Sequence, residues 1–308
     1  MNFFRLKKDQ FGYSLGAIYS FFGYSKQSFY QESKRQNSFK RQEIDVIERI
    51  IKKRLQHPTM GLKKLYHLIK PNLGRDKFIE LAKANGLLAK VPKSFKRTTF
   101  AVKSSKYVNL LVKKQLIDVN QVWVTDITYF RILDRFYYIS LMMDLYSRKI
   151  IAYCAAQTLE AVHSLEVLKS ALSNRRLISY EGLIHHSDKG VQYFYNPYTD
   201  LLEKNRIKIS TCSMVLENSH AERLNGIIKN EYLEKFNIQN FQQLQKTLAK
   251  TVLIYNNERP HLSLNLQTPI EFEENLKNIP IEKRQILVPF TENRPQFLKN
   301  QIELFQDV

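Results

Sequence analysis

The stretch that decides the fold is Val122-Trp-Val-Thr-Asp126-Ile-Thr-Tyr-Phe130. Val, Trp, Ile, Tyr and Phe favour β-strands, and no Gly or Pro interrupts the run, so it predicts one buried strand. Asp126 lies in its middle, where an unpaired charge would be costly. Its carboxylate therefore needs a partner: a base, a hydrogen-bond donor or a metal ion. The plainer alternative is an Asp close to a strand end that accepts hydrogen bonds from backbone N–H groups.

The residues after this strand predict an α/β domain. Strands at 136–144 and 149–156 follow through short connections and complete a three-stranded antiparallel meander. Helices and strands then alternate: a helix at 158–174, a strand at 182–188, a helix at 196–205, a strand at 208–212 and a long helix from about 217. This order predicts a mixed five-stranded sheet with helices packed on it.

The positive charge is concentrated in the first part of the chain. Residues 1–120 carry 26 Lys and Arg against 8 Asp and Glu, whereas residues 121–308 carry 22 against 21. A basic segment attracts polyanions, so it indicates a nucleic-acid partner. A lysine-rich surface that only keeps the protein soluble is the alternative. No apolar run reaches the length of a membrane span and the first residues lack a signal-peptide pattern, so we expect a cytoplasmic protein with no membrane contact.

The basic part predicts helices joined by short turns. Residues 14–22 have apolar residues at helical spacing, Gly23-Tyr24 breaks the run, and Ser25 can cap a second helix that starts at Lys26. This arrangement outlines a helix-turn-helix, a motif that places one helix against DNA.

A second helix-turn-helix is expected after it. Residues 42–55 form a predicted helix with one apolar face, made of Ile44, Ile47, Ile50, Ile51 and Leu55. Two short helices follow, and the second ends in Asn85-Gly86, a helix C-cap pattern. Residues 90–117 are then predicted to form a basic linker that can bind along a phosphate backbone.

The two cysteines, Cys154 and Cys212, lie in apolar or strand-like surroundings. That context predicts two buried free thiols. No group of Cys and His residues has the sequence spacing of zinc ligands, so a zinc-finger module is not expected.

Two acids further along the chain are candidate partners for Asp126. Asp188 ends a predicted strand, and Glu222 lies on the helix that begins near 217. Three carboxylates from two strands and a helix suit divalent cations bound by oxygen. We expect two Mg²⁺ ions, for which Mn²⁺ can substitute, to support phosphodiester chemistry.

Other residues near these acids have separate expected roles. Helical periodicity places three polar side chains near the face of Glu222: Asn218, Asn225 and Lys229. Asp144 also ends a predicted strand, and we expect it to cap the turn that follows.

Four motifs follow one another in the second part of the chain: Trp123-x-x-Asp126-Ile-Thr-Tyr, Met143-Asp-Leu-Tyr-Ser-Arg-Lys-Ile-Ile-Ala, His186-Ser-Asp188-Lys-Gly-x-Gln-Tyr193 and Tyr255-Asn-x-x-Arg259-Pro-His261-x-x-Leu264-x-x-x-Thr-Pro269. In this order and with these gaps they resemble the integrase core of bacterial insertion-sequence transposases of the IS-three group, where the transposase domain is the second reading frame. The resemblance covers roughly residues 10–275.

The resemblance implies an RNase H-like fold with a DDE catalytic triad. Asp126, Asp188 and Glu222 fall on the triad positions, with 33 residues between the last two, slightly fewer than is usual in the family. Lys229 matches a basic residue that contacts terminal DNA in this family. The expected domains are a helical DNA-binding region at 1–89, the basic linker at 90–117, the integrase core at 118–275 and a C-terminal tail at 276–308.

Double-stranded DNA, as element ends and as target, is the implied partner. Besides Lys229, the residues expected to contact it are Asn225, Arg259, His261, Lys26, Lys63, Lys64, Lys96 and Arg97. Because strand transfer needs two ends held together, a homo-oligomer on DNA is expected. The resemblance also implies fusion to the product of an upstream frame, and a location in the bacterial cytoplasm at the nucleoid.

The sequence therefore predicts a DNA transposase that cleaves at element ends and transfers 3′-hydroxyl strands. Two alternatives stay open at this point. One is a catalytically silent DNA-binding regulator that keeps the fold, and the other is an RNase H-type nuclease acting on RNA–DNA hybrids.

Overall fold

The computed structural model describes residues 12, 14–23, 25–89, 107–212 and 218–290, without the side chains of Leu15, Lys26 and Phe29. The chain forms two compact units, each described by itself. One comprises Met1–Leu55 and Gly61–Leu88, and the other comprises Gln56–Met60 and Ala89–Val308. None of the described helices is long and apolar enough to span a lipid bilayer.

The first unit is helical, with α3 (Leu15–Phe21), α4 (Lys26–Gln56), α5 (Leu62–Ile69) and α6 (Arg75–Ala84). Ser25 caps α4 as predicted, since its hydroxyl accepts a hydrogen bond from the N–H of Ser28 at 3.0 Å. The helices predicted separately after Ser25 and at 42–55 are one continuous α4, because no Gly or Pro interrupts residues 33–41.

The buried face of α4 also differs from the predicted one. Val46 and Ile50 are buried, whereas Ile44, Ile51 and Leu55 are exposed. Arginines of α4 bind the chain beyond the short helices: Arg54 donates a hydrogen bond to the carbonyl of Leu87 at 3.0 Å, and Arg49 donates to the carbonyl of Ile69. Tyr66 of α5 and Phe78 of α6 meet edge to face, with ring centroids 5.4 Å apart.

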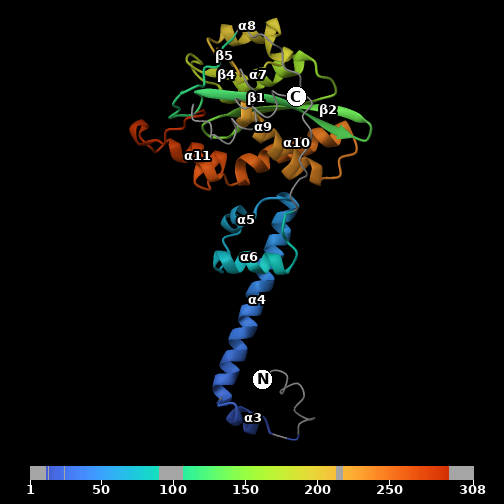
Figure 1. The fold of residues 1–308 in the computed structure, drawn as a ribbon, viewed down its shortest axis with the longest axis vertical. Coiled ribbons are helices and arrows are strands. Elements are labelled where there is room, and N and C mark those ends of the chain that lie inside the picture. Colours follow the sequence, from blue (N-terminus) through green and yellow to red (C-terminus); the bar gives the residue numbers. More distant parts are fainter. Residues whose placement is uncertain (1–11, 13, 24, 90–106, 213–217, 291–308) are drawn as a thin grey trace, which may run out of the picture. The chain divides into compact units, whose positions relative to one another are not determined.

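The second unit is built on the predicted mixed five-stranded sheet (Figure 1). Its strands are β1 (Val122–Ile132), β2 (Arg135–Asp144), β3 (Ile150–Ala156), β4 (Ile184–Ser187) and β5 (Lys208–Thr211). Their order is β3-β2-β1-β4-β5. The first three strands form the antiparallel meander, β4 is parallel to β1, and β5 is parallel to β4. The strand that carries Asp126 is therefore the central one.

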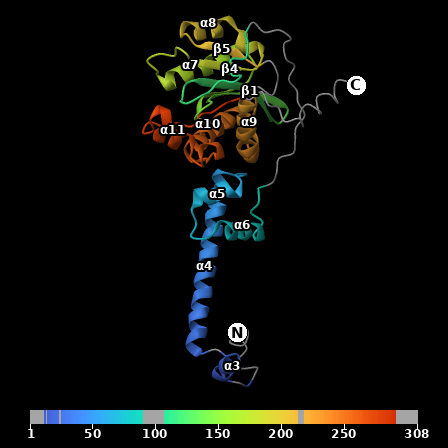
Figure 2. The same cartoon turned by 60° about the vertical axis from the view of Figure 1, so that its left-hand side comes forward.

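Helices cover both faces of this sheet (Figures 1 and 2). The helices on one face are α7 (Ala161–Arg175) and α8 (Asn196–Lys204), and those on the other are α9 (Ser219–Gly226), α10 (Phe241–Glu258) and α11 (Pro269–Leu276). Alternate residues of β1 enter the two cores: Trp123 packs with residues of α7 and α8, and Val122 and Val124 pack with residues of α9 and α10. This alternation follows from the period of two in a strand.

Two segments assigned from sequence to a linker and a tail pack on this unit. Leu111 and Leu116 are fully buried in the core that contains α10. Leu116 and Leu287 exchange two backbone hydrogen bonds of 2.8 Å, and the hydroxyl of Tyr146 donates to the carbonyl of Gln285 at 2.7 Å. The second unit therefore includes described residues on both sides of 118–275.

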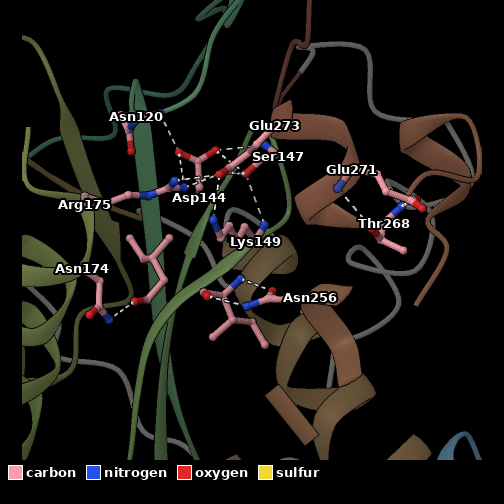
Figure 3. Close-up of polar contacts among 12 residues, drawn as sticks. Asn120, Asp144, Ser147, Lys149, Asn174, Arg175, Asn256, Thr268, Glu271 and Glu273 are labelled. Atoms are coloured by element: carbon pink, nitrogen blue, oxygen red, sulfur yellow. Dashed lines mark hydrogen bonds and ion pairs between the residues drawn. The ribbon is translucent and has the colours of Figure 1, made fainter. Parts of the chain in front are cut away.

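Asn256 ties α10 to the edge strand β3 (Figure 3). Its side-chain oxygen accepts a hydrogen bond from the N–H of Ile150, and its side-chain nitrogen donates to the carbonyl of Ile150, both at 2.9 Å. The side-chain amide thus replaces a neighbouring strand at this point of the edge. Both partners are buried, with Ile150 3% and Asn256 8% exposed.

We predict that Asn256→Leu lowers the free energy of unfolding by about 2–4 kcal/mol, because two buried backbone groups of Ile150 lose their partners. Urea unfolding followed by circular dichroism measures this loss. Asn257→Leu is the matched control, since Asn257 is exposed and bonds only to Leu253 within its own helix. Equal losses in the two variants would contradict the assigned role of Asn256.

Candidate active site

Asp126 lies on the central strand and is partly buried. Asn225 of α9 donates a hydrogen bond to its carboxylate from Nδ2, at 2.9 Å. Burial, the charge of Asp188 and, to a smaller extent, the charge of Glu222 raise the pKa of Asp126 to about 8. Without a cation, the Asp126 carboxyl therefore holds a proton at neutral pH.

Asp188 follows β4 directly, and β4 is the parallel neighbour of β1. Its Oδ1 accepts a hydrogen bond from the N–H of Gly190 at 3.0 Å, which fixes the carboxylate at the end of the strand. A Cβ atom at position 190 would lie 3.0 Å from that oxygen and 2.9 Å from Oε1 of Gln192, so a larger residue there would displace these two side chains. Burial raises the pKa of Asp188 as well.

Glu222 lies on α9 and its side chain is exposed. Its charge acts on Asp126, as the raised pKa of that carboxyl shows. The oxygens of the three acids are not all within 4.8 Å of one another. Among the described residues, the group of three metal-ligating side chains that meets this distance is Cys154, His163 and Glu166.

Two asparagines of this region hold oxygens that lack hydrogen-bond partners within the described part of the chain. Asn218 donates a bond from Nδ2 to the carbonyl of Thr125 at 3.3 Å, and Asn225 donates to Asp126. The Oδ1 atom of each is buried and unpartnered. Because buried polar atoms normally have partners, each of these two oxygens can bind a cation or accept a hydrogen bond from a water molecule.

Lys229 lies on a π-helix, Ile227–Tyr232, that continues α9. Its ammonium group lies 4.5 Å from the ring centroid of Tyr129, on the same strand as Asp126. The sequence pattern predicts an uninterrupted helix here and indicates neither the π-helix nor the contact of Lys229 with Tyr129. The one available signal was the place of Tyr129 within the first motif.

Arg259 and His261 follow α10 and are 3% and 7% exposed. The guanidinium of Arg259 binds both carboxylate oxygens of Glu231, a residue of the π-helix, at 2.9 and 3.0 Å. The ring of His261 packs edge to face on Tyr255, with centroids 5.0 Å apart. These contacts join the end of α10 to the π-helix, and contact with DNA stays a prediction for both residues.

The remaining predicted DNA contacts lie away from the triad in the sequence. Lys63 and Lys64 lie on α5, with Lys63 exposed and Lys64 partly buried, and Lys26 begins α4. Lys96 and Arg97 lie outside the described residues.

Asp144 caps a turn, as predicted. Its Oδ1 accepts hydrogen bonds from the N–H groups of Tyr146 and Ser147 at 3.0 and 2.9 Å. Its side chain also lies 3.6 Å from Arg175, which binds Glu273 of α11 through two hydrogen bonds (Figure 3). Because its carboxylate is held by these contacts, Asp144 has a structural role in holding α11 to the sheet.

We predict that Asp126→Asn changes how stability depends on pH in the metal-free protein. A carboxyl with a pKa of about 8 in the folded state, above its unfolded value, keeps a proton that the unfolded chain loses. Stability of the wild type should therefore fall as pH rises from about 4 to 8, by at most about 1.4 kcal/mol per pH unit from this group. Asp126→Asn removes that contribution. The free energy of unfolding of the variant, relative to that of the wild type, should therefore increase from pH 5 to pH 8.

Urea unfolding with a chelator present, at several pH values, measures this difference. Asp134→Asn serves as control, because Asp134 is an exposed acid on the β1–β2 turn. A difference between Asp126→Asn and wild type that stays constant with pH would contradict the raised pKa.

The chain is similar to several known proteins. Models of the integrase core domain match residues 118–214 and residues 206–269. The 31 kDa protein of insertion element IS600 from Shigella sonnei is 28% identical over 271 residues, which make up 82% of this chain and 96% of that protein. A transposase-like protein from Haemophilus influenzae is 32% identical over 155 residues, 50% of this chain and 70% of that protein.

The transposase for insertion sequence element IS629 from Shigella sonnei is 31% identical over 157 residues, and the alignment spans 50% of this chain and 52% of that transposase. Among solved structures, one chain of a simian T-cell lymphotropic virus intasome, in complex with PP2A regulatory subunit B56 gamma, is 16% identical with a TM-score of 0.48. That match covers 80% of this chain and 77% of the other. The sequence matches show that the chain belongs to the insertion-sequence transposases of the retroviral integrase, or DDE, superfamily.

Proposed function

We propose that this chain is a metal-dependent DNA transposase that cleaves at insertion-sequence ends and transfers the 3′-hydroxyl strands to a target. Its catalytic acids would be Asp126, Asp188 and Glu222. The observation that supports the proposal is the surroundings of Asp126, whose pKa is raised by burial, by the charge of Asp188 from the end of β4 and, to a smaller extent, by the charge of Glu222 from α9.

The donor set of this site fits Mg²⁺. It offers carboxylate oxygens and the unpartnered amide oxygens of Asn218 and Asn225, and hard divalent cations prefer oxygen ligands. Repulsion among the acids disfavours their charged forms, and a divalent cation offsets that repulsion. Asp126, Asp188 and Glu222 would hold the two ions, and Mn²⁺ could replace Mg²⁺ there.

When bound, the ions would activate the attacking water or 3′-hydroxyl and stabilise the leaving oxygen of the phosphodiester. The chain's own residues prepare the site for this. Asn225 orients the Asp126 carboxylate, and the N–H of Gly190 orients that of Asp188. Glu222, exposed on α9, is the most adjustable of the three acids and can turn towards the ions and the DNA.

Double-stranded DNA is the proposed substrate, and the basic residues 1–120 are its proposed docking region, because they carry 26 Lys and Arg against 8 Asp and Glu. Lys63 and Lys64 of α5 are candidates for phosphate contacts. A homo-oligomer that holds two element ends, and a contribution from an upstream frame, complete the proposal.

We predict that Asp126→Asn, Asp188→Asn and Glu222→Gln each lower DNA cleavage by about 10³-fold or more, because each removes several kcal/mol of charge stabilisation in the transition state. A supercoiled plasmid that carries the element ends, incubated with Mg²⁺, measures nicking and strand transfer. DNA binding, measured by gel shift, should persist in all three variants. Asp134→Asn should cleave like the wild type.

The outcomes separate the alternatives. Cleavage that persists in any one of the three variants would remove that acid from the triad. A wild type that binds element ends but never cleaves them with Mg²⁺ or Mn²⁺ would favour the silent regulator. Preferential cleavage of an RNA–DNA hybrid over duplex DNA would favour the RNase H-type nuclease.

Lys229→Ala should weaken binding to element ends and lower the slope of log K against log salt by about one, because one phosphate contact is lost. Fluorescence anisotropy at several salt concentrations measures both quantities. Lys235→Ala is the matched control, since Lys235 is an exposed lysine on the 3₁₀ turn after the π-helix. Equal changes in the two variants would contradict a specific contact by Lys229.

A further inference from the structure

We propose a second metal site, for a transition-metal ion of the Zn²⁺ type, formed by Cys154, His163 and Glu166. Cys154 lies on the edge strand β3, and His163 and Glu166 lie one turn apart on α7, which packs on that strand. One ligand atom from each residue lies within 4.8 Å of the other two. The three side chains come from two elements that tertiary packing brings together.

The spacing inside this group suits a tetrahedral ion. Nδ1 of His163 lies 3.5 Å from Oε2 of Glu166. In a tetrahedral zinc site, with bonds of about 2.0–2.3 Å, ligand atoms lie roughly 3.3–3.8 Å apart. This pair therefore already has the separation of two ligands of one ion. Glu166 is 59% and His163 29% exposed, so an ion can enter from solvent and the glutamate can adjust to it.

The other nitrogen of His163 has the partner expected of a metal-bound imidazole. Nε2 lies 3.2 Å from Oγ1 of Thr158. Histidines that bind a metal through one ring nitrogen commonly donate a hydrogen bond from the other, which fixes the ring and its tautomer. If Nε2 donates to Thr158 in this way, Nδ1 is the ring nitrogen that would bind the ion.

A pocket beside the group supplies room for a fourth ligand. Its lining includes Cys154, His163, Thr158 and two buried serines, Ser140 and Ser164. Ser140 and Ser164 are 5% and 2% exposed, and within the described residues neither hydroxyl has a hydrogen-bond partner. Buried hydroxyls without partners indicate a missing polar occupant. A water that completes the coordination of the ion could bond to them.

The chemistry of this site differs from that of the triad. A thiolate, an imidazole and one carboxylate select a softer ion, whereas Mg²⁺ prefers oxygen ligands. The two sites also use different faces of the sheet, since Cys154 packs with the core that includes α7 and Asp126 is bonded to α9. A bound ion would hold α7 to the edge strand, and the proposal does not depend on DNA cleavage.

Zinc binding to the full chain, with any affinity tag removed, tests the proposal. The measurement uses the Asp126→Asn variant, so that zinc binding at the triad does not add to the signal. Competition with a chromophoric chelator should give one tight Zn²⁺ per chain, retained in excess Mg²⁺. Cys154→Ser and His163→Ala should each abolish that binding, and Thr158→Val should weaken it about tenfold through loss of the outer partner. Cys212→Ser, the matched thiol control, should bind normally.

Cobalt provides a second readout that identifies which thiol binds the metal. Co²⁺ in this background should give a thiolate-to-metal absorption band that disappears in Cys154→Ser and persists in Cys212→Ser. Circular dichroism shows whether each variant is folded. The proposal is overturned by a folded protein that binds no tight Zn²⁺, by unchanged binding in folded Cys154→Ser and His163→Ala, or by a thiolate band that follows Cys212 instead.

Discussion

The sheet of the second unit is built around one unfavourable arrangement: the carboxyl of Asp126 lies at its centre, where burial, the charge of Asp188 and, to a smaller extent, the charge of Glu222 raise its pKa. A sheet of this kind would be more stable with an apolar residue there. The repulsion is tolerated because the carboxyl can hold a proton, because Asn225 donates a hydrogen bond to it, and because strongly packed cores lie on both faces. In the metal-free protein, a proton therefore neutralises the Asp126 carboxyl, as a cation is proposed to do in the active protein.

Much of the surrounding polar structure serves to keep α9 beside the central strand. Arg259 binds Glu231 directly after α9, and Asn256 binds the edge strand from α10. On the opposite edge of the helical layer, Glu273 of α11 is held by Arg175, Lys149 and Ser147. Several residues of the motifs, among them Arg259 and Asn256, therefore have a structural role, because they hold the helices in place.

Sequence patterns were sufficient where local preference and tertiary packing agree. The β-meander and the cap at Ser25 follow from strand-forming runs and from a serine before a helix, and the structure has both. The placement of Asp126 on a central strand needed the order of the strands as well, which alternation of elements indicates but does not fix.

The patterns failed where distant packing decides. The buried face of α4 is set by what covers it, so Val46 is buried and Ile44 is exposed. The backbone hydrogen bonds between Leu287 and Leu116 join segments that are far apart in the chain, and no local sequence pattern predicts them. Cys154 and His163 have no ligand-like sequence spacing, and they meet only because α7 packs on β3. Their grouping therefore could not be inferred before the fold.

The π-helix that carries Lys229 constrains how this protein can vary in length. Lys229 is seven residues after Glu222, but the last of these positions lie in a wider turn, so the spacing does not correspond to two α-helical turns. Deleting one residue within the π-helix would close the wide turn into an ordinary α-helical one and change the positions of its side chains. The contacts of Lys229 with Tyr129 and of Glu231 with Arg259 would both be affected. Insertions and deletions in this segment should thus be far less tolerated than substitutions.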